Sequence, residues 1–499
     1  MKEKELLRRA KARFAQDRAP FVTAMLAGMA AHGYAFSNKL VNHDEIESLF
    51  GKGATVTSGR WGLEAVKLLF PDWSMPWVYG LVSLLLIAAA ACLMLRFLGI
   101  RSRFWQGLLA ALVVTFPSLT GNFCFMFTAA PYAWAFCLTA LAVYLWRWGD
   151  WRRGALSLVL LVLALGIYQA YIAVAASLFI LKMIADALDG ERGVWEIVLD
   201  GLKALLLMAV AIAVYYAVTL LVFRFTGAEF NSYVTENVNG SVSLPRRVRM
   251  AYDAFWYVFS FRNFYLVPFE VSRYIHIALA VLTLAGLGVV IGGKKKALHG
   301  ALALFLTLLL PLGIGCMYLI MSRASIHTLV MYSFVTVYFL TALVMERLPV
   351  GPVRRGRELT ALALSAVVVC NVYFANMVYL KLQLQYENAY AFYTVLSTRI
   401  METEGFDENC TVALVGRQEQ LLHRFPELDT ELFMAAPADL VNIYSRENLL
   451  RNFLGLELPF ADDKTTERLA SDPRVEAMPA YPYAGSVQML DGVIVVKLG

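Results

Sequence analysis

Long apolar runs alternate with short polar segments along the first 380 residues. Runs of bilayer-spanning length predict membrane helices, and eleven such spans are expected, at about 20–38, 76–97, 104–120, 122–146, 154–168, 170–187, 203–223, 273–292, 297–320, 327–346 and 358–380. Their apolar cores contain no Asp, Glu, Lys or Arg away from the ends. The pattern therefore predicts an all-α polytopic membrane protein.

The apolar run at 154–187 decides the topology. It is too long for one ordinary span, and a break at residues 166–169, Gly-Ile-Tyr-Gln, divides it into two short helices. With that break, the basic clusters at 101–103, 147–153, 294–296 and 354–357 fall on the same side as the basic N-terminus, as the positive-inside rule requires. We expect the N-terminus in the cytoplasm and the chain after residue 380 outside.

The apolar pattern changes after residue 380. Residues 382–404 continue as a helix, 411–416 (TVALVG) form a buried strand, and 418–425 and 446–456 are short amphipathic helices. Residues 486–498 form a hairpin around Asp491-Gly492. The predicted domains are thus a cytoplasmic segment at 1–19, a transmembrane domain at 20–380 and a small extracytoplasmic α/β domain at 381–499.

Composition and charge support this division. The chain is 59% hydrophobic, and Lys and Arg number 44 against 38 Asp and Glu. Residues 381–499 hold 10 of the basic and 18 of the acidic residues, net −8, which leaves +14 for the rest. The six cysteines include no close pair that suggests a metal site or a disulfide framework. No nucleotide-binding or nucleic-acid-binding motif is present, so no nucleic-acid partner and no cofactor are expected.

The polar loop after the first span concentrates reactive side chains. Within 41–62, VNHDEIESLFGKGATVTSGRWG, it places three acids and His43 ahead of Arg60 and Trp61. A carboxylate can act as a base, an arginine can bind phosphate and a tryptophan can stack on a sugar. The alternative is a solvated loop at a membrane exit whose charges only stay hydrated.

A second outer loop, 224–272, has mixed character. Its second half, 246–264, spaces four arginines among aromatic residues, which predicts an amphipathic helix at the membrane interface. These arginines suit either a lipid-phosphate site or anchoring to anionic headgroups.

Several sequence elements together resemble the GtrII-type glucosyltransferases, a family of serotype-converting membrane enzymes of the GT-C class. These elements are NHDE at 42–45, GRWG at 59–62, GIYQAY at 166–171, SRAS at 322–325 and the ending YPYAGSVQMLDGVIVVKL. The resemblance implies a GT-C architecture. It also implies inverting transfer of a sugar, often glucose, from a polyprenyl-phosphate donor to an acceptor glycan outside the cytoplasmic membrane.

The resemblance also implies roles for particular residues. GT-C enzymes use an acid in the first outer loop as the base, which corresponds here to Asp44 or Glu45. The phosphate-binding candidates, because each sits at a predicted outer span end, are Arg60, Arg273 and Arg323. Candidate pocket residues, with their structural alternatives, are His43 (a loop residue), Trp61 (a membrane-belt residue), and Tyr168 and Gln169 (helix packing). No metal is assigned, although Asp44, Glu45 and Glu47 can together bind a divalent ion.

Two other classes compete with the enzyme. A lipid-linked-sugar flippase or transporter explains many spans but predicts polar residues through the membrane. A non-catalytic scaffold held by its outer domain predicts that the loop acids are dispensable.

Overall fold

The computed structural model describes residues 2–51, 53, 55–147, 149–238, 242–259, 271–293, 296–321, 328–349, 354–416, 428, 440–441 and 443–498. Contacts between Cα atoms divide them into two units. Unit 1 comprises residues 2–39 and 50–378, and unit 2 comprises 40–49 together with the described residues from 379 onward. The segment with the three acids of the first loop thus belongs to unit 2.

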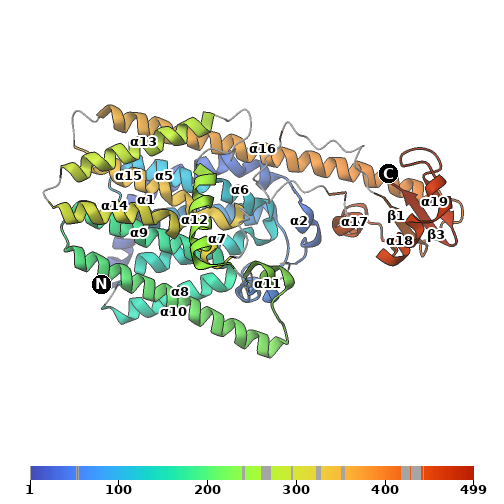
Figure 1. Ribbon diagram of the computed structural model, residues 1–499, viewed down its shortest axis with the longest axis horizontal. Helices are drawn as coiled ribbons and strands as arrows, with labels where there is room; N and C mark the ends of the chain where they lie inside the picture. The colour runs from blue at the N-terminus through green and yellow to red at the C-terminus, as the bar shows by residue number, and fades with distance from the viewer. Residues whose placement is uncertain are drawn as a thin grey trace. The chain divides into compact units, whose positions relative to one another are not determined.

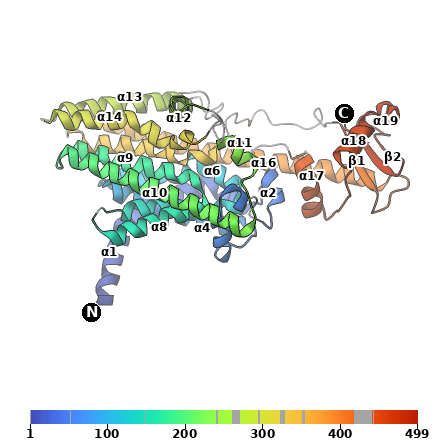
Figure 2. The ribbon, with the colours of Figure 1, turned by 60° about the horizontal axis from the view of Figure 1, so that its bottom comes forward.

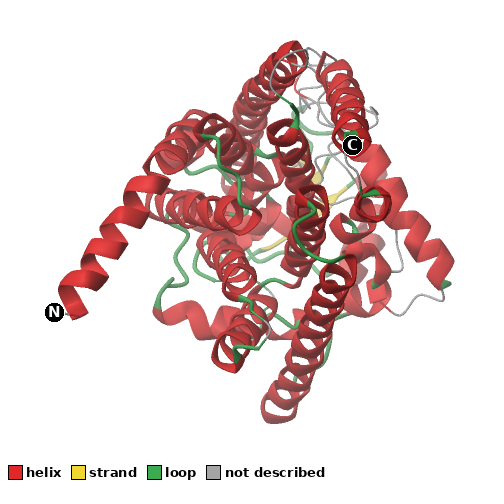
Figure 3. Ribbon diagram, turned by 90° about the vertical axis from the view of Figure 1, so that its left-hand side faces the viewer, coloured by secondary structure: helices red, strands yellow, loops and turns green. Residues whose placement is uncertain are grey.

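The regular elements among the described residues of unit 1 are all helices or 3₁₀ turns, joined by loops (Figures 1 and 3). Its elements are α1 (Lys2–Ser37), η1 (Val56–Ser58), α3 (Gly62–Ala65), η2 (Val66–Leu68), α4 (Pro76–Leu98), α5 (Arg103–Thr115), α6 (Pro117–Cys124), α7 (Met126–Leu145), α8 (Trp151–Ile167), η3 (Gln169–Tyr171), α9 (Ile172–Asp189), α10 (Val194–Thr226), α11 (Ser232–Val238), α12 (Leu244–Phe259), α13 (Val271–Gly292), α14 (Ala297–Ile314), η4 (Cys316–Leu319), η5 (Thr328–Thr336), α15 (Val337–Arg347) and α16 (Arg354–Met401), whose residues from 379 belong to unit 2.

Nine helices in the described part of the chain are long and apolar enough to cross a membrane. They coincide with nine of the eleven predicted spans and make the chain a membrane protein. The other two predictions, 20–38 and 154–168, lie in α1 and α8, which are helical but are not among the nine; α8 has 17 residues. The number of spans and their direction across the bilayer stay predictions.

The predicted break near Tyr168 is confirmed. Helix α8 ends at Ile167, Tyr168 adopts extended backbone (φ −153°, ψ 106°), and the 3₁₀ turn η3 begins at Gln169. A second interruption separates α5 from α6, where Pro117 begins a new helix because proline lacks the N–H that a continuing helix needs.

Burial separates the helices of unit 1 into inner and outer ones. Helices α5, α7 and α15 bury most of their side chains, whereas α10 and α13 leave most of theirs exposed. Exposed apolar faces on long helices are suited to contact with lipid tails. Figure 2 shows α10 alongside α8, and α8 carries the Tyr168 turn at its end.

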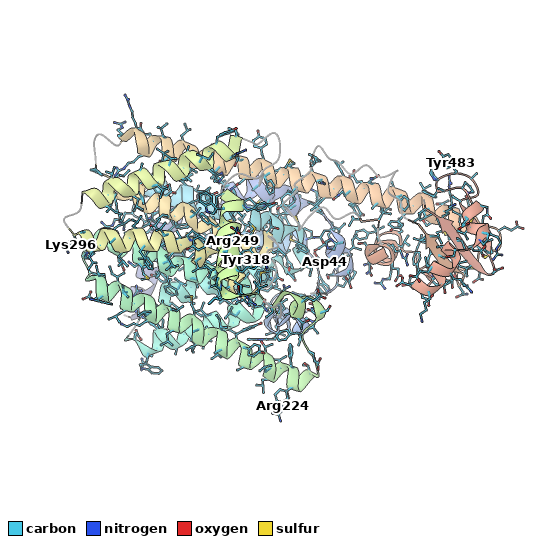
Figure 4. All side chains as sticks on the ribbon, in the orientation of Figure 1. Asp44, Arg224, Arg249, Lys296, Tyr318 and Tyr483 are labelled. Carbon is cyan, nitrogen blue, oxygen red and sulfur yellow. The ribbon has the colours of Figure 1, made fainter. Side chains whose placement is uncertain are left out.

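Helix α12 is amphipathic, as predicted for this part of the 224–272 loop; residues 260–264 lie outside the described residues. Its buried face packs on η4, where Gly315 lies against Ala251. Arg247 turns inward and donates hydrogen bonds to the carbonyl oxygens of Leu319 and Ile320 (3.0 and 2.8 Å). Arg249 is exposed and pairs with Asp253 at 3.4 Å, and Figure 4 labels it with Tyr318 of η4.

Unit 2 has a three-stranded sheet in the order β1-β3-β2. Strand β3 (Val493–Lys497) runs parallel to β1 (Thr411–Val415) and antiparallel to β2 (Val487–Leu490), which confirms the predicted strand and the hairpin at Asp491-Gly492. The helices of this unit are α2 (His43–Glu47), the end of α16, α17 (Ile443–Leu449), the π-helical turn η7 (Leu450–Leu454), α18 (Asp463–Ala470) and α19 (Pro473–Ala477). The helix predicted at 418–425 lies outside the described residues.

Alternating residues of the central strands feed two cores on opposite faces of this sheet. Ala413 and Val495 pack with the residues of α18 and α19. Val412 and Ile494 pack with α16 and α17. This second core also contains Val41, which precedes α2, and Ile46, which lies within α2.

Candidate functional site

The segment from Thr55 to Trp61 forms a tight turn in unit 1. The 3₁₀ turn η1 ends at Gly59, whose left-handed backbone (φ 70°) suits glycine best. The Arg60 N–H then donates to the Thr55 carbonyl oxygen at 2.9 Å. A Cβ on Gly59 would lie 2.6 Å from the Tyr215 hydroxyl oxygen, so a side chain there clashes with α10.

Two side chains from membrane helices fix this turn. The Gln169 amide donates to the Ser58 carbonyl oxygen (3.0 Å) and to the Tyr215 hydroxyl (2.8 Å). The Tyr215 hydroxyl in turn donates to the Gly59 carbonyl oxygen at 3.0 Å. Gln169, predicted as a pocket residue, therefore holds the backbone on the N-terminal side of Arg60.

Asn231 fixes the same turn from the start of α11. Its backbone N–H donates to the Thr57 carbonyl oxygen (3.0 Å), and its side-chain amide donates to the Ser58 hydroxyl (3.1 Å). Its side-chain oxygen accepts from Val234 N–H at 2.9 Å and so caps the helix. Three segments distant in sequence thus converge on one short turn.

Arg60 extends from this turn onto two aromatic rings. One guanidinium nitrogen donates to the Tyr132 hydroxyl at 2.8 Å. The guanidinium carbon lies 5.3 Å from the centre of the Tyr168 ring and 5.9 Å from that of Tyr132. The two rings stack with their centres 4.2 Å apart and their planes 21° apart. Cation–π attraction and the hydrogen bond both orient the positive charge.

Trp61 packs tightly against the end of α8. A Cβ on Gly166 would lie 2.6 Å from the Trp61 ring, so only glycine permits this approach. The indole Nε1 is buried and, among the described residues, donates to no acceptor. The end of α8 thus covers part of the Trp61 ring. The buried indole N–H is the group through which Trp61 can bind a ligand oxygen.

An ion-pair network braces the chain after the turn. Lys67 Nζ lies 2.6 Å from a Glu64 carboxylate oxygen and 3.2 Å from one of Asp72. The Thr55 hydroxyl donates to Glu64 at 2.6 Å. Partial burial opposes ionisation of Glu64, but the hydrogen bonds from Lys67 and Thr55 outweigh it and lower the Glu64 pKa. The hydrogen bonds from Lys67 to Glu64 and Asp72, with the charges of these two carboxylates, raise the Lys67 pKa.

The rings continue from the turn into the membrane helices. Tyr168 meets Tyr171 edge to face with ring centres 5.1 Å apart. The Tyr171 hydroxyl accepts a hydrogen bond from the Asn122 amide at 3.3 Å, while the buried Asn122 side-chain oxygen accepts none from the part of the chain that the structure describes. Tyr168 is thus the middle member of a polar–aromatic row and not an isolated packing residue.

Sequence reasoning missed four members of this cluster. The side-chain hydrogen bonds that link these four residues to the rest of the cluster join positions 46 to 173 apart in the chain. No short motif marks such partners, because Tyr132 and Tyr215 lie inside apolar runs and Asn231 lies in a polar loop. The missed residues are Asn122, Tyr132, Tyr215 and Asn231.

The acids lie on the short helix α2, in unit 2, which Figure 4 marks by Asp44. Asn42 caps the helix, because its side-chain oxygen accepts from the Glu45 N–H at 2.8 Å. The Asp44 side chain is 40% exposed, and one of its oxygens lies 3.5 Å from His43 Nε2. Glu45 is fully buried and Glu47 is exposed. Asp44 is therefore the acid with both access to a substrate and a neighbouring histidine.

The remaining candidates are placed as follows. Arg273 is exposed at the start of α13, with its guanidinium carbon 6.0 Å from the Tyr274 ring. Arg323 and the SRAS element lie outside the described residues. Of the three predicted phosphate-binding arginines, Arg60 is the one that the structure places in a preorganised polar cluster.

Comparison with known proteins gives this geometry a context. The model of one protein family, described as Glucosyl transferase GtrII, matches residues 33–340. The chain belongs to this family. The match covers more than half of the chain and confirms the resemblance to GtrII-type glucosyltransferases. No curated protein and no solved structure matches the chain.

Membership of the GtrII family indicates a glycosyltransferase, which uses a sugar donor and an acceptor glycan. The matched range includes α2, the Arg60 turn and the Tyr168 turn. It ends before α16 and so leaves out most of unit 2.

Proposed function

We propose that this GtrII family member moves a hexose, glucose in the first instance, from a polyprenyl-phosphate carrier to an acceptor glycan. The transfer takes place on the outer face of the cytoplasmic membrane and inverts the anomeric centre. The observation that carries the proposal is the Arg60 turn. It presents a guanidinium beside the end of a membrane helix, where the phosphate of a lipid donor lies.

The chemistry needs one base and one cation. The acceptor hydroxyl oxygen attacks the anomeric carbon on the face opposite the phosphate and loses its proton to the Asp44 carboxylate. The bond from the anomeric carbon to the phosphate oxygen breaks, and polyprenyl phosphate departs with the electron pair. Arg60 stabilises the negative charge on that phosphate.

Asp44 is preferred over Glu45 because of its exposure. A base must reach the acceptor hydroxyl, and the Asp44 side chain is accessible whereas Glu45 is fully buried. His43, 3.5 Å from Asp44, orients the carboxylate. Asp44 and Arg60 belong to different units, and each role rests on the contacts within its own unit.

The test is transfer by the purified full-length protein in liposomes. The protein is given polyprenyl-phosphate glucose, mannose or galactose with a cell-surface polysaccharide acceptor, and release of polyprenyl phosphate is followed by mass spectrometry. We expect release that depends on the acceptor and on one donor sugar. Movement of intact donor across the bilayer with no release would establish the flippase alternative instead.

The orientation has its own test. Single cysteines replace exposed residues of α11 (Glu236→Cys), of the C-terminal domain (Glu408→Cys) and of the turn before α14 (Lys296→Cys). A membrane-impermeant maleimide should label the first two from outside intact cells and leave the third unlabelled. Labelling at position 296 would contradict the eleven-span arrangement.

A further inference from the structure

The acid-bearing helix α2 is held by the core of the C-terminal unit. Val41, just before the helix, and Ile46, within it, are 1% and 0% exposed. Both belong to the apolar cluster that contains Leu449 and Leu450. Asp44 lies between these two residues in the chain, so the position of its backbone depends on how Val41 and Ile46 pack in the core.

A polar contact from Asn452 adds to this attachment. The side-chain amide of Asn452 donates to the Ile46 carbonyl oxygen at 3.2 Å. A helix as short as α2 leaves its last carbonyl groups without partners inside the helix. Asn452 supplies one such partner and so acts as a side-chain cap on the C-terminal end of α2.

Asn452 stands on an unusual stretch of backbone. Residues 450–454 form a π-helical turn, η7, directly after α17. The turn closes with Leu456 N–H donating to the Leu450 carbonyl oxygen at 3.1 Å. Such turns are rare and are frequently found at functional sites. Here the turn carries the amide that reaches α2.

We propose that Asn452 is a positioning residue for transfer, which holds α2 so that Asp44 meets the acceptor hydroxyl. The inference rests on the proposed role of Asp44. It makes the C-terminal unit a working part of the enzyme, although most of that unit lies outside the region that matches the family.

The experiment compares three substitutions of Asn452 in the full-length protein in liposomes. Asn452→Asp keeps the shape but removes the donor, Asn452→Ala removes the side chain, and Asn452→Gln keeps the amide on a longer stem. The matched control is Asn409→Asp, which breaks an exposed amide contact to Asp407 in the same unit. The readouts are kcat, the KM of donor and acceptor, the melting temperature and hydrogen exchange of residues 43–50.

We expect Asn452→Asp and Asn452→Ala to lower kcat by about 10-fold, because small misplacements of a catalytic group cost large factors in rate. The KM of the donor should change little, and exchange in α2 should quicken while exchange in β1 and β3 stays the same. Asn452→Gln should recover part of kcat. In an Asp44→Asn background, Asn452→Asp should have no further effect on kcat.

Two results would overturn the positioning role. The first is that the Asn452 variants leave both kcat and hydrogen exchange in α2 unchanged. The second is that Asn452→Asp and Asn409→Asp lose kcat in the same proportion to their loss of melting temperature. Undiminished transfer by Asp44→Asn would instead overturn the proposed role of Asp44 as the base, and with it the role that Asn452 serves. The two failures are therefore distinguishable.

Discussion

The Arg60 turn and helix α2 lie close together in sequence but are held by different forces. The turn is fixed by directional hydrogen bonds from Gln169, Tyr215 and Asn231. Helix α2 is fixed by buried apolar side chains and by the side-chain amide of Asn452. Directional bonds set an orientation, as phosphate binding needs, whereas apolar anchors set a position and leave the Asp44 side chain accessible.

This difference predicts separate experimental signatures. Changes around the turn should appear mainly in donor affinity, because they disturb the cation that binds the donor phosphate. Changes in α2 should appear mainly in turnover, because they disturb the base. Each prediction below separates or joins these two signatures.

The largest effect is expected for Asp44→Asn. Asparagine keeps the size of the side chain but cannot accept the proton, so kcat should fall by about 10²-fold or more. The control is Glu47→Gln, which removes an exposed acid from the same helix and should leave kcat within about 2-fold of wild type. Initial rates at saturating donor measure both. Near-normal rates for Asp44→Asn would move the base elsewhere.

Arg60→Ala should weaken donor binding by about 10- to 100-fold, since hydrogen bonds to charged groups contribute about 1.5–3 kcal/mol. Arg60→Lys should restore only part of this, because an ammonium cannot make the two-pronged contact of a guanidinium. The matched control is Arg224→Ala, an exposed cation in the last turn of α10 that Figure 4 labels.

The dependence of transfer on donor concentration measures this effect, with melting temperatures taken alongside. Equal losses of donor affinity in Arg60→Ala and Arg224→Ala would mark both arginines as membrane anchors.

Tyr215→Phe should have a smaller effect on donor binding than Arg60→Ala. It removes the hydroxyl that joins Gln169 to the Gly59 carbonyl oxygen, at a cost of about 1 kcal/mol, and should weaken donor binding by a few fold with kcat preserved. Tyr216→Phe, at the exposed neighbouring position, serves as the control. A drop in kcat without a change in donor affinity would break the proposed separation.

The smallest effect is expected for Glu64→Gln. The Glu64 pKa is lowered in the folded protein, so the carboxylate stabilises the fold above its ordinary pKa of 4.5, and this contribution is lost as pH falls through the lowered pKa. The side chain is 41% exposed, so screening limits the stabilisation to about 0.5 kcal/mol or less. Thermal melting at pH 7 should show a slightly lower Tm for the variant than for wild type, and this difference in Tm should shrink as the pH is lowered below 4.5.

Periodicity and turn chemistry predicted most of the fold. Apolar runs locate the helices, and Asp491-Gly492 locates the hairpin, because both depend on neighbouring residues. The break at Tyr168 also followed from span length and charge placement. The grouping of α2 with the C-terminal core was not predicted, because it depends on contacts between residues about 400 positions apart, such as Ile46 and Asn452.

For the candidate site, the sequence predicted which residues are reactive but not what surrounds them. His43, Asp44, Arg60 and Trp61 were chosen for their chemistry, which the sequence displays. The sequence could not predict the surroundings of these residues, because the burial of Glu45 and the packing of Trp61 on Gly166 arise only when the chain folds.

Equilibrium binding of the lipid donor without acceptor tests the central claim most directly. Purified wild type, Asp44→Asn and Arg60→Ala are titrated with polyprenyl-phosphate glucose in the same liposomes, and transfer is measured on the same samples. The account predicts that Asp44→Asn binds donor as wild type does but fails to transfer, whereas Arg60→Ala binds it at least 10-fold more weakly. Weakened binding by Asp44→Asn with unchanged binding by Arg60→Ala would contradict it.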